Sequence, residues 1–375
     1  MTAPLSGLRV LDFSRVLSGP YASMILADLG ADVVKIEDPR AGDDTRAFGP
    51  PYLDGVSTYF LSINRGKRSV TLDLKDPAHV ARALALAATA DVVLENFRPG
   101  VMARLGLGPD VLRAQNPRLI YCAISGFGMD SDRPGYDLMV QGLSGIPSLT
   151  GEADGPPYKC GASIADLVSG QNAVQGILAA LLRRASTGEG GVVDVPMLDG
   201  QLALLTYHAS AWLNAGRAPG RIGNHHPSIH PFSAYATADG HLNLAVGNDR
   251  LWGAFCKAVA RPDWASDARF LTNRSRVEHR AAVDALLRPL FLSRDTAAWV
   301  ALLDAAGVPC GPMRTVPEAL ADAALVSHPH PDTGAPVRTV ALPWILSDAP
   351  RASERRAPRL GEHTDEVLAD WLGPT

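Results

Sequence analysis

Cysteine is scarce in this chain, and its placement excludes two common structural devices. The 375 residues include four cysteines, and no two of them form a CxxC pair. That spacing is the usual mark of a cysteine zinc site, and regularly spaced, paired cysteines mark the disulfide framework of a small secreted domain. We therefore expect reduced thiols. The four residues are Cys122, Cys160, Cys256 and Cys310.

An excess of positive charge and long apolar runs are also missing. The formal net charge is −4, so the chain lacks the bulk basic field that neutralises a nucleic-acid backbone. The longest apolar stretch, near residues 173–182, is much shorter than the roughly 20 residues that cross a bilayer. The first residues lack the basic and apolar regions of a secretory signal. We expect no nucleic-acid partner, no membrane span and a cytoplasmic protein.

Several short motifs that hold cofactors or carry catalysis are absent. The first expected strand is followed by DFSRVLSGPYA rather than GxGxxG, and no GxxxxGK[ST] occurs, so neither a dinucleotide fingerprint nor a P-loop is present. GxSxG, HExxH and an EF-hand loop are missing too. Neither a nicotinamide cofactor nor a metal ion is expected, and any ligand must be held by other means.

What the chain does contain is an alternation of short buried strands and helices. Runs such as RVLDFS, YASMILADLG and DVVKIED recur along the first half, which predicts an α/β fold with a parallel sheet. The length exceeds the roughly 250 to 300 residues of a single core. We predict a Rossmann-like large domain and a smaller α+β domain. The predicted ranges are 1–215 for the first part of the large domain, 216–330 for the small domain with its linkers, and 331–375 for the return to the large domain.

Basic side chains gather in two loops of the predicted large domain. One interpretation is that the arginine side chains in these loops bind the phosphates of a ligand. The alternative is that the loops form a solvated surface without a ligand. The second loop, ENFRPG, directly follows a strand, and open α/β sheets bind ligands at that end of their strands. Two basic loops at one edge favour the ligand. The basic residues are Arg40, Arg46, Arg65, Lys67, Arg68 and Lys75 in the first loop and Arg98 and Arg104 in the second.

Asp166 lies at the head of an otherwise apolar helical run, GASIADLVSGQNAVQGILAALLRR. The ordinary interpretation is a helix cap, whose oxygen accepts a hydrogen bond from a free amide. The same position lowers the pKa of a carboxylate through the helix dipole, and an ionised, partly desolvated carboxylate is a nucleophile. Asp137, in PGYDLMVQ, has the same two interpretations.

Three histidines lie within six residues, at His225, His226 and His230. Their HHxxxH spacing, with intervening prolines, does not match a helical i, i+4 pair of ligands, and no carboxylate pair stands nearby in the sequence. A structural loop is the favoured interpretation over a metal site.

Seven separated segments together resemble one known family. LSGLRVLDFSRVLSGPYASMILADLGADVVKIEDP, YFLSINRGKRSVTLDLK, ADVVLENFRPG, PRLIYCAISGFG, GYDLMVQGLSG, SIADLVSG and PRLGEHTDEVL are similar, in order and spacing, to the family III CoA-transferases. That group, also called the CaiB/BaiF family, includes formyl-CoA transferases and α-methylacyl-CoA racemases. The resemblance covers nearly the whole chain, and its specificity comes from the common order of all seven segments.

The resemblance implies an interlocked homodimer that binds coenzyme A as an acyl-CoA substrate along the large domain. It also implies that Asp166 is the covalent nucleophile. From the proposed chemistry we further expect Asp137 to orient the acceptor or a water, and Gly247 to lie in a mobile loop over the site. Asp38 stands where the family often has an arginine, and Arg40 is a candidate to replace it. The expected coenzyme A contacts combine residues implied by the resemblance with four of the basic residues described above. They are Val16, Arg40, Tyr59, Arg65, Leu72, Asn96, Phe97, Arg98 and Arg104.

Within that group, a transferase is favoured over a racemase. Racemisation needs two groups that exchange protons near neutral pH. In the racemases of this group, the His-Asp pair of a GHD motif is suited to this exchange. This chain has Gly135-Tyr136-Asp137, and tyrosine has a pKa near 10. We expect transfer of CoA from an acyl-CoA to a carboxylic acid through an aspartyl-CoA thioester, with a dicarboxylate such as succinate as one partner. The alternatives are an α-methylacyl-CoA racemase and a CoA-binding protein without turnover.

Overall fold

The computed structural model describes residues 3–373, which divide into two compact units. The first unit extends through Ile146, continues over Lys159–Gly216 and resumes at Ala324. The second consists of Pro147–Tyr158 and Arg217–Ala323. The sequence placed the boundaries at 216 and 331, whereas the units divide at 217 and 324. It also assigned 147–158 to the large domain, and this segment packs instead with the second unit.

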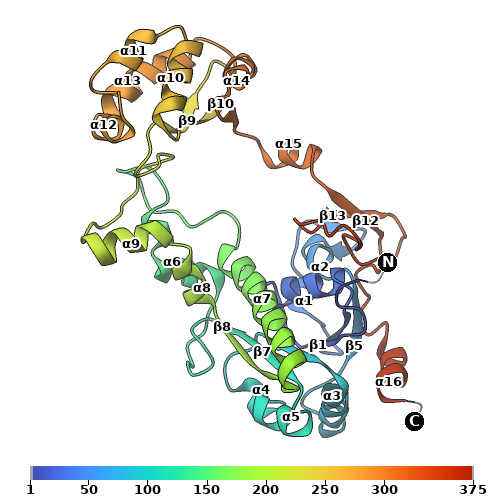
Figure 1. Ribbon diagram of the computed structural model, residues 1–375. Coiled ribbons are helices and arrows are strands. Elements are labelled where there is room, and N and C mark those ends of the chain that lie inside the picture. Colours follow the sequence, from blue (N-terminus) through green and yellow to red (C-terminus); the bar gives the residue numbers. More distant parts are fainter. Residues whose placement is uncertain (1–2, 374–375) are drawn as a thin grey trace. The chain divides into compact units, whose positions relative to one another are not determined.

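A six-stranded parallel sheet forms the centre of the first unit (Figure 1). Its strand order is β5-β2-β1-β6-β7-β8, which is the arrangement of a doubly wound Rossmann-like sheet. Strands are added outward in one direction from β1 and in the other direction from β6, so the strand order reverses between these two central neighbours. Most strand residues are buried because both faces are covered. The strands are β1 Arg9–Asp12, β2 Asp32–Glu37, β5 Lys67–Thr71, β6 Val92–Glu95, β7 Ile120–Ser125 and β8 Gly191–Pro196.

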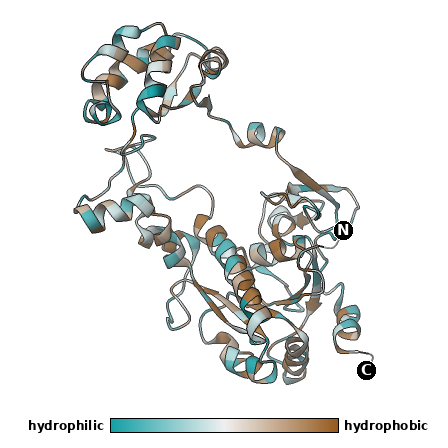
Figure 2. Cartoon of the chain, in the orientation of Figure 1, coloured by the Kyte–Doolittle hydropathy of each residue, from teal (hydrophilic) through white to brown (hydrophobic). Residues whose placement is uncertain are grey.

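Helices cover both faces of this sheet, and each face has its own apolar core. On one face, α1 (Ser18–Asp28) and α7 (Ile164–Thr187) pack on alternate strand residues such as Val10 and Val33. On the other face, α3 (Pro77–Thr89), α5 (Pro109–Gln115) and α16 (Thr364–Leu372) pack against the intervening positions. Figure 2 shows apolar residues along α1 and α7 interrupted by polar ones. Because alternate residues of each strand face the two different cores, the register of each strand is fixed, and with it the positions of the loops at the strand ends.

Gly30 ends the first helix in the conformation that the sequence predicts. Its φ is 100°, in the left-handed region that favours glycine. A Cβ atom at this position would lie 2.3 Å from the Cβ of Ala3, so a larger residue would force the chain apart here.

Shorter elements complete the first unit. No helix among residues 3–373 is long and apolar enough to span a bilayer. The remaining elements are η1 Asp44–Arg46, β3 Tyr52–Leu53, β4 Val56–Ser57, α2 Thr58–Ile63, α4 Val101–Arg104, α6 Asp137–Ser144, α8 Met197–Ala203, α9 Thr206–Ala215, β12 Leu325–Pro329 and β13 Pro336–Val340, with η2 Ile146–Ser148 at the junction of the units.

The second unit is the smaller α+β body that the sequence predicts. A three-stranded antiparallel sheet, in the order β11-β10-β9, packs with helices around a core that includes Trp252, Phe255 and Trp299. Its elements are β9 Phe232–Ala236, β10 His241–Ala245, α10 Asp249–Ala258, α11 Pro262–Ser266, α12 Asn273–Glu278, α13 Arg280–Phe291, α14 Thr296–Ala305, β11 Cys310–Pro312 and α15 Val316–Ala321.

Candidate active site

Hydrogen bonds join the loops that follow β1 and β6, the two neighbouring strands between which the strand order of the sheet reverses. The Asn96 side chain accepts a hydrogen bond from the Arg15 amide at 2.8 Å and donates to the Arg15 carbonyl at 2.7 Å. Val16, next in the loop, has a φ of 67°, and its amide donates to Asp43 at 3.2 Å. Because open α/β sheets bind ligands at this reversal, the cavities around these loops are the candidate site.

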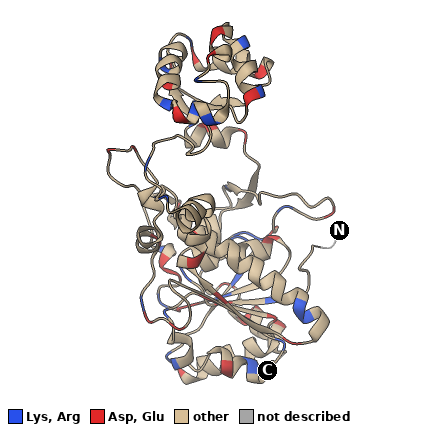
Figure 3. Ribbon diagram, turned by 60° about the vertical axis from the view of Figure 1, so that its left-hand side comes forward, with Lys and Arg blue, Asp and Glu red and all other residues tan. Residues whose placement is uncertain are grey.

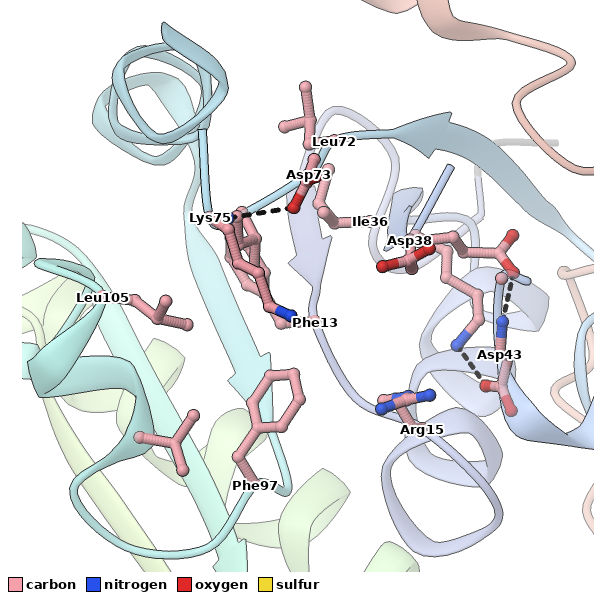
Figure 4. A pocket seen from close by; sticks show the side chains of 15 residues that line it. Phe13, Arg15, Ile36, Asp38, Asp43, Leu72, Asp73, Lys75, Phe97 and Leu105 are labelled. Carbon is pink, nitrogen blue, oxygen red and sulfur yellow. Dashed lines mark hydrogen bonds and ion pairs between the residues drawn. The ribbon is translucent and has the colours of Figure 1, made fainter. Parts of the chain in front are cut away.

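The first cavity has a volume of about 270 Å³ and lies beside the ends of β1, β2 and β5 (Figure 4). Apolar side chains form much of its wall, and charged groups stand at its edges. Lys75 reaches this cavity from the loop after β5 (Figure 4). Such a wall accommodates a ligand with both apolar and anionic parts. Its lining includes Phe13, Arg15, Ile36, Asp38, Leu72, Asp73, Lys75, Phe97, Val101 and Leu105.

A buried ion pair between Lys35 and Asp43 also lines this cavity. Their charged atoms lie 2.7 Å apart, and both side chains are fully buried. Lys35 also donates to the Ser14 carbonyl at 2.7 Å. Burial opposes ionisation of both groups, but Asp43 raises the pKa of Lys35, and Lys35 lowers the pKa of Asp43 to about 2. The pair therefore stays charged and holds the loop after β1 in place.

The basic cluster of the first loop is largely a set of internal ion pairs, which corrects the phosphate-binding interpretation. Each of five cations is paired with a carboxylate: Arg40 with Asp38, Arg46 with Glu37, Arg65 with Asp28, Lys67 with Asp12 and Arg68 with Asp32. Figure 3 shows acidic and basic residues together among the strands of the sheet. Of the six predicted cations, only Lys75 lines the first cavity.

The second cavity, of about 300 Å³, contains Asp166 and Asp137 in its wall. Asp166 is the third residue of α7, and the helix is capped by a different carboxylate. Asp137 accepts a hydrogen bond from the Ala165 amide at 2.9 Å and another from the Gln141 side chain at 2.8 Å. Asp166 therefore does not cap its helix, and Asp137 caps α7 rather than its own helix, α6. The lining also includes Arg15, Val16, Ser18, Asn96, Phe97, Arg98, Arg133 and Tyr136.

The pKa of Asp166 departs from the sequence prediction. Burial and, to a smaller extent, the charge of Asp137 raise it to about 7, although a hydrogen bond with Ser18 opposes this rise. The helix dipole was expected to lower this pKa, but desolvation in the cavity wall outweighs that effect. Both the ionised and the neutral form of Asp166 are therefore accessible near neutral pH, as is typical of groups in functional sites.

We expect the rate of any reaction in which Asp166 is the nucleophile to fall as the pH drops below about 7. Asp137→Asn removes one of the charges that raise this pKa while keeping an oxygen for the Ala165 amide. The acidic limb of kcat/KM should then move about half to one pH unit lower. Asp130→Asn, an exposed change in the preceding loop, serves as the control. An unmoved limb in Asp137→Asn would contradict the coupling.

The structure brings together about half of the predicted site residues. Val16, Asn96, Phe97 and Arg98 line the second cavity, Phe97 also lines the first, and Leu72 lines the first. Tyr59 and Arg65 line a third cavity of about 970 Å³. Arg65 is already paired with Asp28, and burial, with smaller contributions from Asp166, Asp43 and Asp137, raises the pKa of Tyr59 to about 12.

The other predicted residues lie elsewhere. Arg40 is exposed and held by Asp38 at 2.7 Å, and Arg104 is exposed on α4. Neither lines these three cavities. Gly247 belongs to the second unit, between β10 and α10, and its proposed loop function stays a prediction.

Sequence reasoning missed three residues that shape the site. Ser18, at the start of α1, bonds to Asp166, and the Lys35–Asp43 pair lines the first cavity. The only sequence signal for Ser18 was its place in the loop after the first strand. The sequence signal for the Lys35–Asp43 pair was the position of Lys35 within an apolar strand, VVKIE. A lysine in such a strand is buried, and a buried lysine requires a carboxylate partner.

Comparisons with known proteins agree on one family. The model of CoA-transferase family III matches residues 5–364. The chain belongs to this family. It is therefore a CoA-transferase, an enzyme class that acts on CoA thioesters. A succinate–glutarate CoA-transferase of Agrobacterium fabrum is 42% identical, covering 98% of this chain and 95% of that protein.

Two further relatives give the same answer. Succinyl-CoA:glutarate CoA-transferase of Mus musculus is 38% identical over 98% of this chain and 86% of that protein. The crystal structure of a CaiB/BaiF family protein from Brucella suis has a TM-score of 0.87 and 39% identity, covering 99% of this chain and 100% of that one. The parallel sheet, the helices on both its faces and the small α+β unit thus follow a fold already seen in this family.

Proposed function

We propose that this CoA-transferase moves CoA from succinyl-CoA to a second dicarboxylic acid, such as glutarate, through a covalent intermediate on Asp166. The observation that carries the proposal is a partly buried carboxylate in the wall of a cavity that shares Phe97 and Arg15 with the first cavity. The substrate pair follows the names of the two glutarate-using relatives.

The two cavities correspond to the two ends of a CoA thioester. The nucleotide would occupy the first cavity, where apolar walls contact the base and Lys75 pairs with a phosphate. The pantetheine arm would pass Phe97 and Arg15, which belong to both linings, and deliver the thioester to Asp166. The loop tied by Asn96 and Arg15 then sets the path of the arm.

Two acyl exchanges account for the transfer. Ionised Asp166 attacks the thioester carbonyl of succinyl-CoA, the carbon–sulfur bond breaks, and a mixed anhydride and the CoA thiolate form. The thiolate attacks the Asp166 carbonyl, which gives an aspartyl-CoA thioester and releases succinate. The acceptor carboxylate attacks this thioester to form a new anhydride, and the thiolate then attacks the acceptor carbonyl, which frees Asp166. The thioester energy is conserved throughout, so ATP is not required.

Asp137 has a positioning function in this scheme. It accepts the hydrogen bond from the Ala165 amide and so fixes the first turn of α7, on which Asp166 lies. Its charge also raises the pKa of the nucleophile. The amide of Leu167 already donates to the Ser163 carbonyl, so the oxyanion formed in each step requires donors other than the amides of Ala165 and Leu167.

Two arginines of the second cavity, Arg98 and Arg133, suit the second carboxylate of a dicarboxylic acid. Arg133 also stacks on Phe127, with 4.1 Å between the guanidinium carbon and the ring centroid, which limits the orientations of its fork. A racemase is less well supported, because Tyr136 occupies the position of a proton-exchanging histidine and the residue is 66% exposed.

The interlocked homodimer is part of the same proposal. Helix α9 contains no buried residue, and its Trp212 and Leu213 side chains are 56% and 77% exposed. A soluble protein seldom leaves such groups in water, and a second copy of the chain would cover them.

A panel of acceptors tests the proposed substrates. With succinyl-CoA as donor, we expect glutarate to give a new CoA ester at least about tenfold faster than a monocarboxylate of similar length, because a second charged group pairs with the arginines. The products are identified by mass spectrometry. Equal rates for both classes would contradict the dicarboxylate preference, and deuterium uptake at the α-carbon of a 2-methylacyl-CoA would favour the racemase.

A further inference from the structure

Two of the three histidines that the sequence left as a structural loop meet a carboxylate in the second unit. His225 and His230 precede β9, and Asp284 lies on α13. One nitrogen or oxygen atom of each residue lies within 4.8 Å of those of the other two. The sequence offered no such carboxylate, because Asp284 is more than fifty positions away.

We propose that His225, His230 and Asp284 form a Zn²⁺ site in the second unit. Nothing in the transfer chemistry uses these residues, so the proposal is independent of the function of Asp166. Two imidazoles and one carboxylate form a donor set that zinc prefers, with a water as the fourth ligand.

The spacing of the ligand atoms supports coordination over direct hydrogen bonding. Nε2 of His225 and Nε2 of His230 each lie 3.4 Å from an oxygen of Asp284. Charge-assisted hydrogen bonds are shorter, at about 2.7 to 2.9 Å. Ligands that bind zinc at about 2.0 to 2.1 Å in tetrahedral geometry lie about 3.3 Å from one another. The His225 contact is to Oδ2 of Asp284 and the His230 contact is to Oδ1, so each imidazole lies at about this separation from one of the two carboxylate oxygens.

His230 provides a separate observation that points to a ligand. Its side chain is fully buried, and its Nε2 atom has no hydrogen-bond partner among the described residues. Leaving a buried polar atom unpaired is unfavourable, and a metal ion would satisfy it.

Neighbouring groups determine how this site would hold an ion. Tyr235 donates to Asp284 at 3.0 Å, which orients the carboxylate as second-shell partners of metal ligands do. Arg280 and Arg288 oppose any cation electrostatically. A hard ion such as Mg²⁺, held mainly by charge, is therefore disfavoured relative to zinc, which bonds to nitrogen lone pairs.

Arg280 also determines the proton position that metal binding must change. Its Nη1 lies 3.3 Å from Nδ1 of His230, and its Nη2 donates to the His226 carbonyl at 2.8 Å. An arginine only donates, so the contact to His230 places the ring proton on Nε2. Zinc at Nε2 would have to displace this proton, so metal binding and the Arg280 contact compete for His230.

Zinc binding by the full-length, chelator-stripped protein tests the site. We expect one Zn²⁺ per chain with a Kd of about 1 μM or tighter, measured by competition with a chromophoric chelator. Cobalt in its place should give the intense visible bands of a four-coordinate ion. His225→Gln and Asp284→Asn should each weaken binding at least about 30-fold, since each removes one ligand. His279→Gln, which changes an exposed histidine of the same unit, should bind as the wild type does.

Two results would overturn the site. One is zinc binding by the wild type that is weaker than about 100 μM. The other is a ligand variant that binds zinc as tightly as His279→Gln. The His225 side chain is only partly buried, so His225→Gln decides the matter if Asp284→Asn does not fold.

Discussion

Replacement of Asp166 by asparagine should abolish CoA exchange while leaving acyl-CoA binding intact. Asparagine has nearly the same shape but lacks the anionic oxygen that attacks the thioester, so we expect kcat to fall at least about 10³-fold. The first cavity, where the nucleotide would bind, does not include Asp166 in its lining. The Kd for a non-reactive CoA thioester should therefore change less than about threefold. Steady-state kinetics and equilibrium binding measure the two quantities.

The stability of the same variant separates loss of a nucleophile from misfolding. Burial raises the pKa of Asp166 to about 7 in the folded protein, above its unfolded value of about 3.9. The stability that accompanies the protonated group is full below pH 4 and is lost as the pH rises to 7. Asp166→Asn should thus be more stable than the wild type at pH 8, by about 1 to 2 kcal/mol, and the difference should shrink toward pH 4. A variant that is less stable at pH 8 would contradict the raised pKa.

Asp43→Asn should have the second large effect, on folding and on acyl-CoA binding together. It leaves Lys35 fully buried without its partner at 2.7 Å, and breaking a buried pair in this way costs about 3 to 5 kcal/mol. The Val16 amide also loses its charged acceptor, so the loop after β1 shifts and the KM for acyl-CoA rises. Urea unfolding and steady-state kinetics measure the two changes.

An exposed ion pair provides the matched control. Asp267→Asn breaks the pair with Arg269 on the surface of the second unit, and we expect no measurable loss of stability. Replacing both members of the buried pair, with Lys35→Met and Asp43→Asn, should recover part of the loss because the unpaired Lys35 charge is gone. A single Asp43→Asn variant as stable as Asp267→Asn would show that the buried pair does not hold the loop.

The periodic features of the chain predicted the sheet well. Buried strands such as VVKIE and IYCAIS and the helices between them follow local patterns of apolar residues. The ends of β1 and β6 bring Asn96 next to Arg15, which lies about eighty positions earlier in the chain. The order of the strands is the only sequence signal for this contact. The resemblance to a family supplied the position of the proposed nucleophile.

The electrostatics of the site could not be predicted in the same way. Arg65 and Lys67 appeared to be ligand-binding cations because their partners, Asp28 and Asp12, belong to other segments of the chain. The pKa of Asp166 depends on burial and on Asp137, which is 29 positions away. These interactions arise from tertiary packing, and the one-dimensional pattern of charges does not contain them.

The covalent state of Asp166 during turnover tests the central claim most directly. The protein is incubated with succinyl-CoA and no acceptor, treated with hydroxylamine or borohydride, digested and sequenced by mass spectrometry. We predict a hydroxamate or a reduced side chain at Asp166 in the wild type and none at that position in Asp166→Asn. An unmodified Asp166 in an enzyme that is exchanging CoA, or a modification on another residue, would contradict the account.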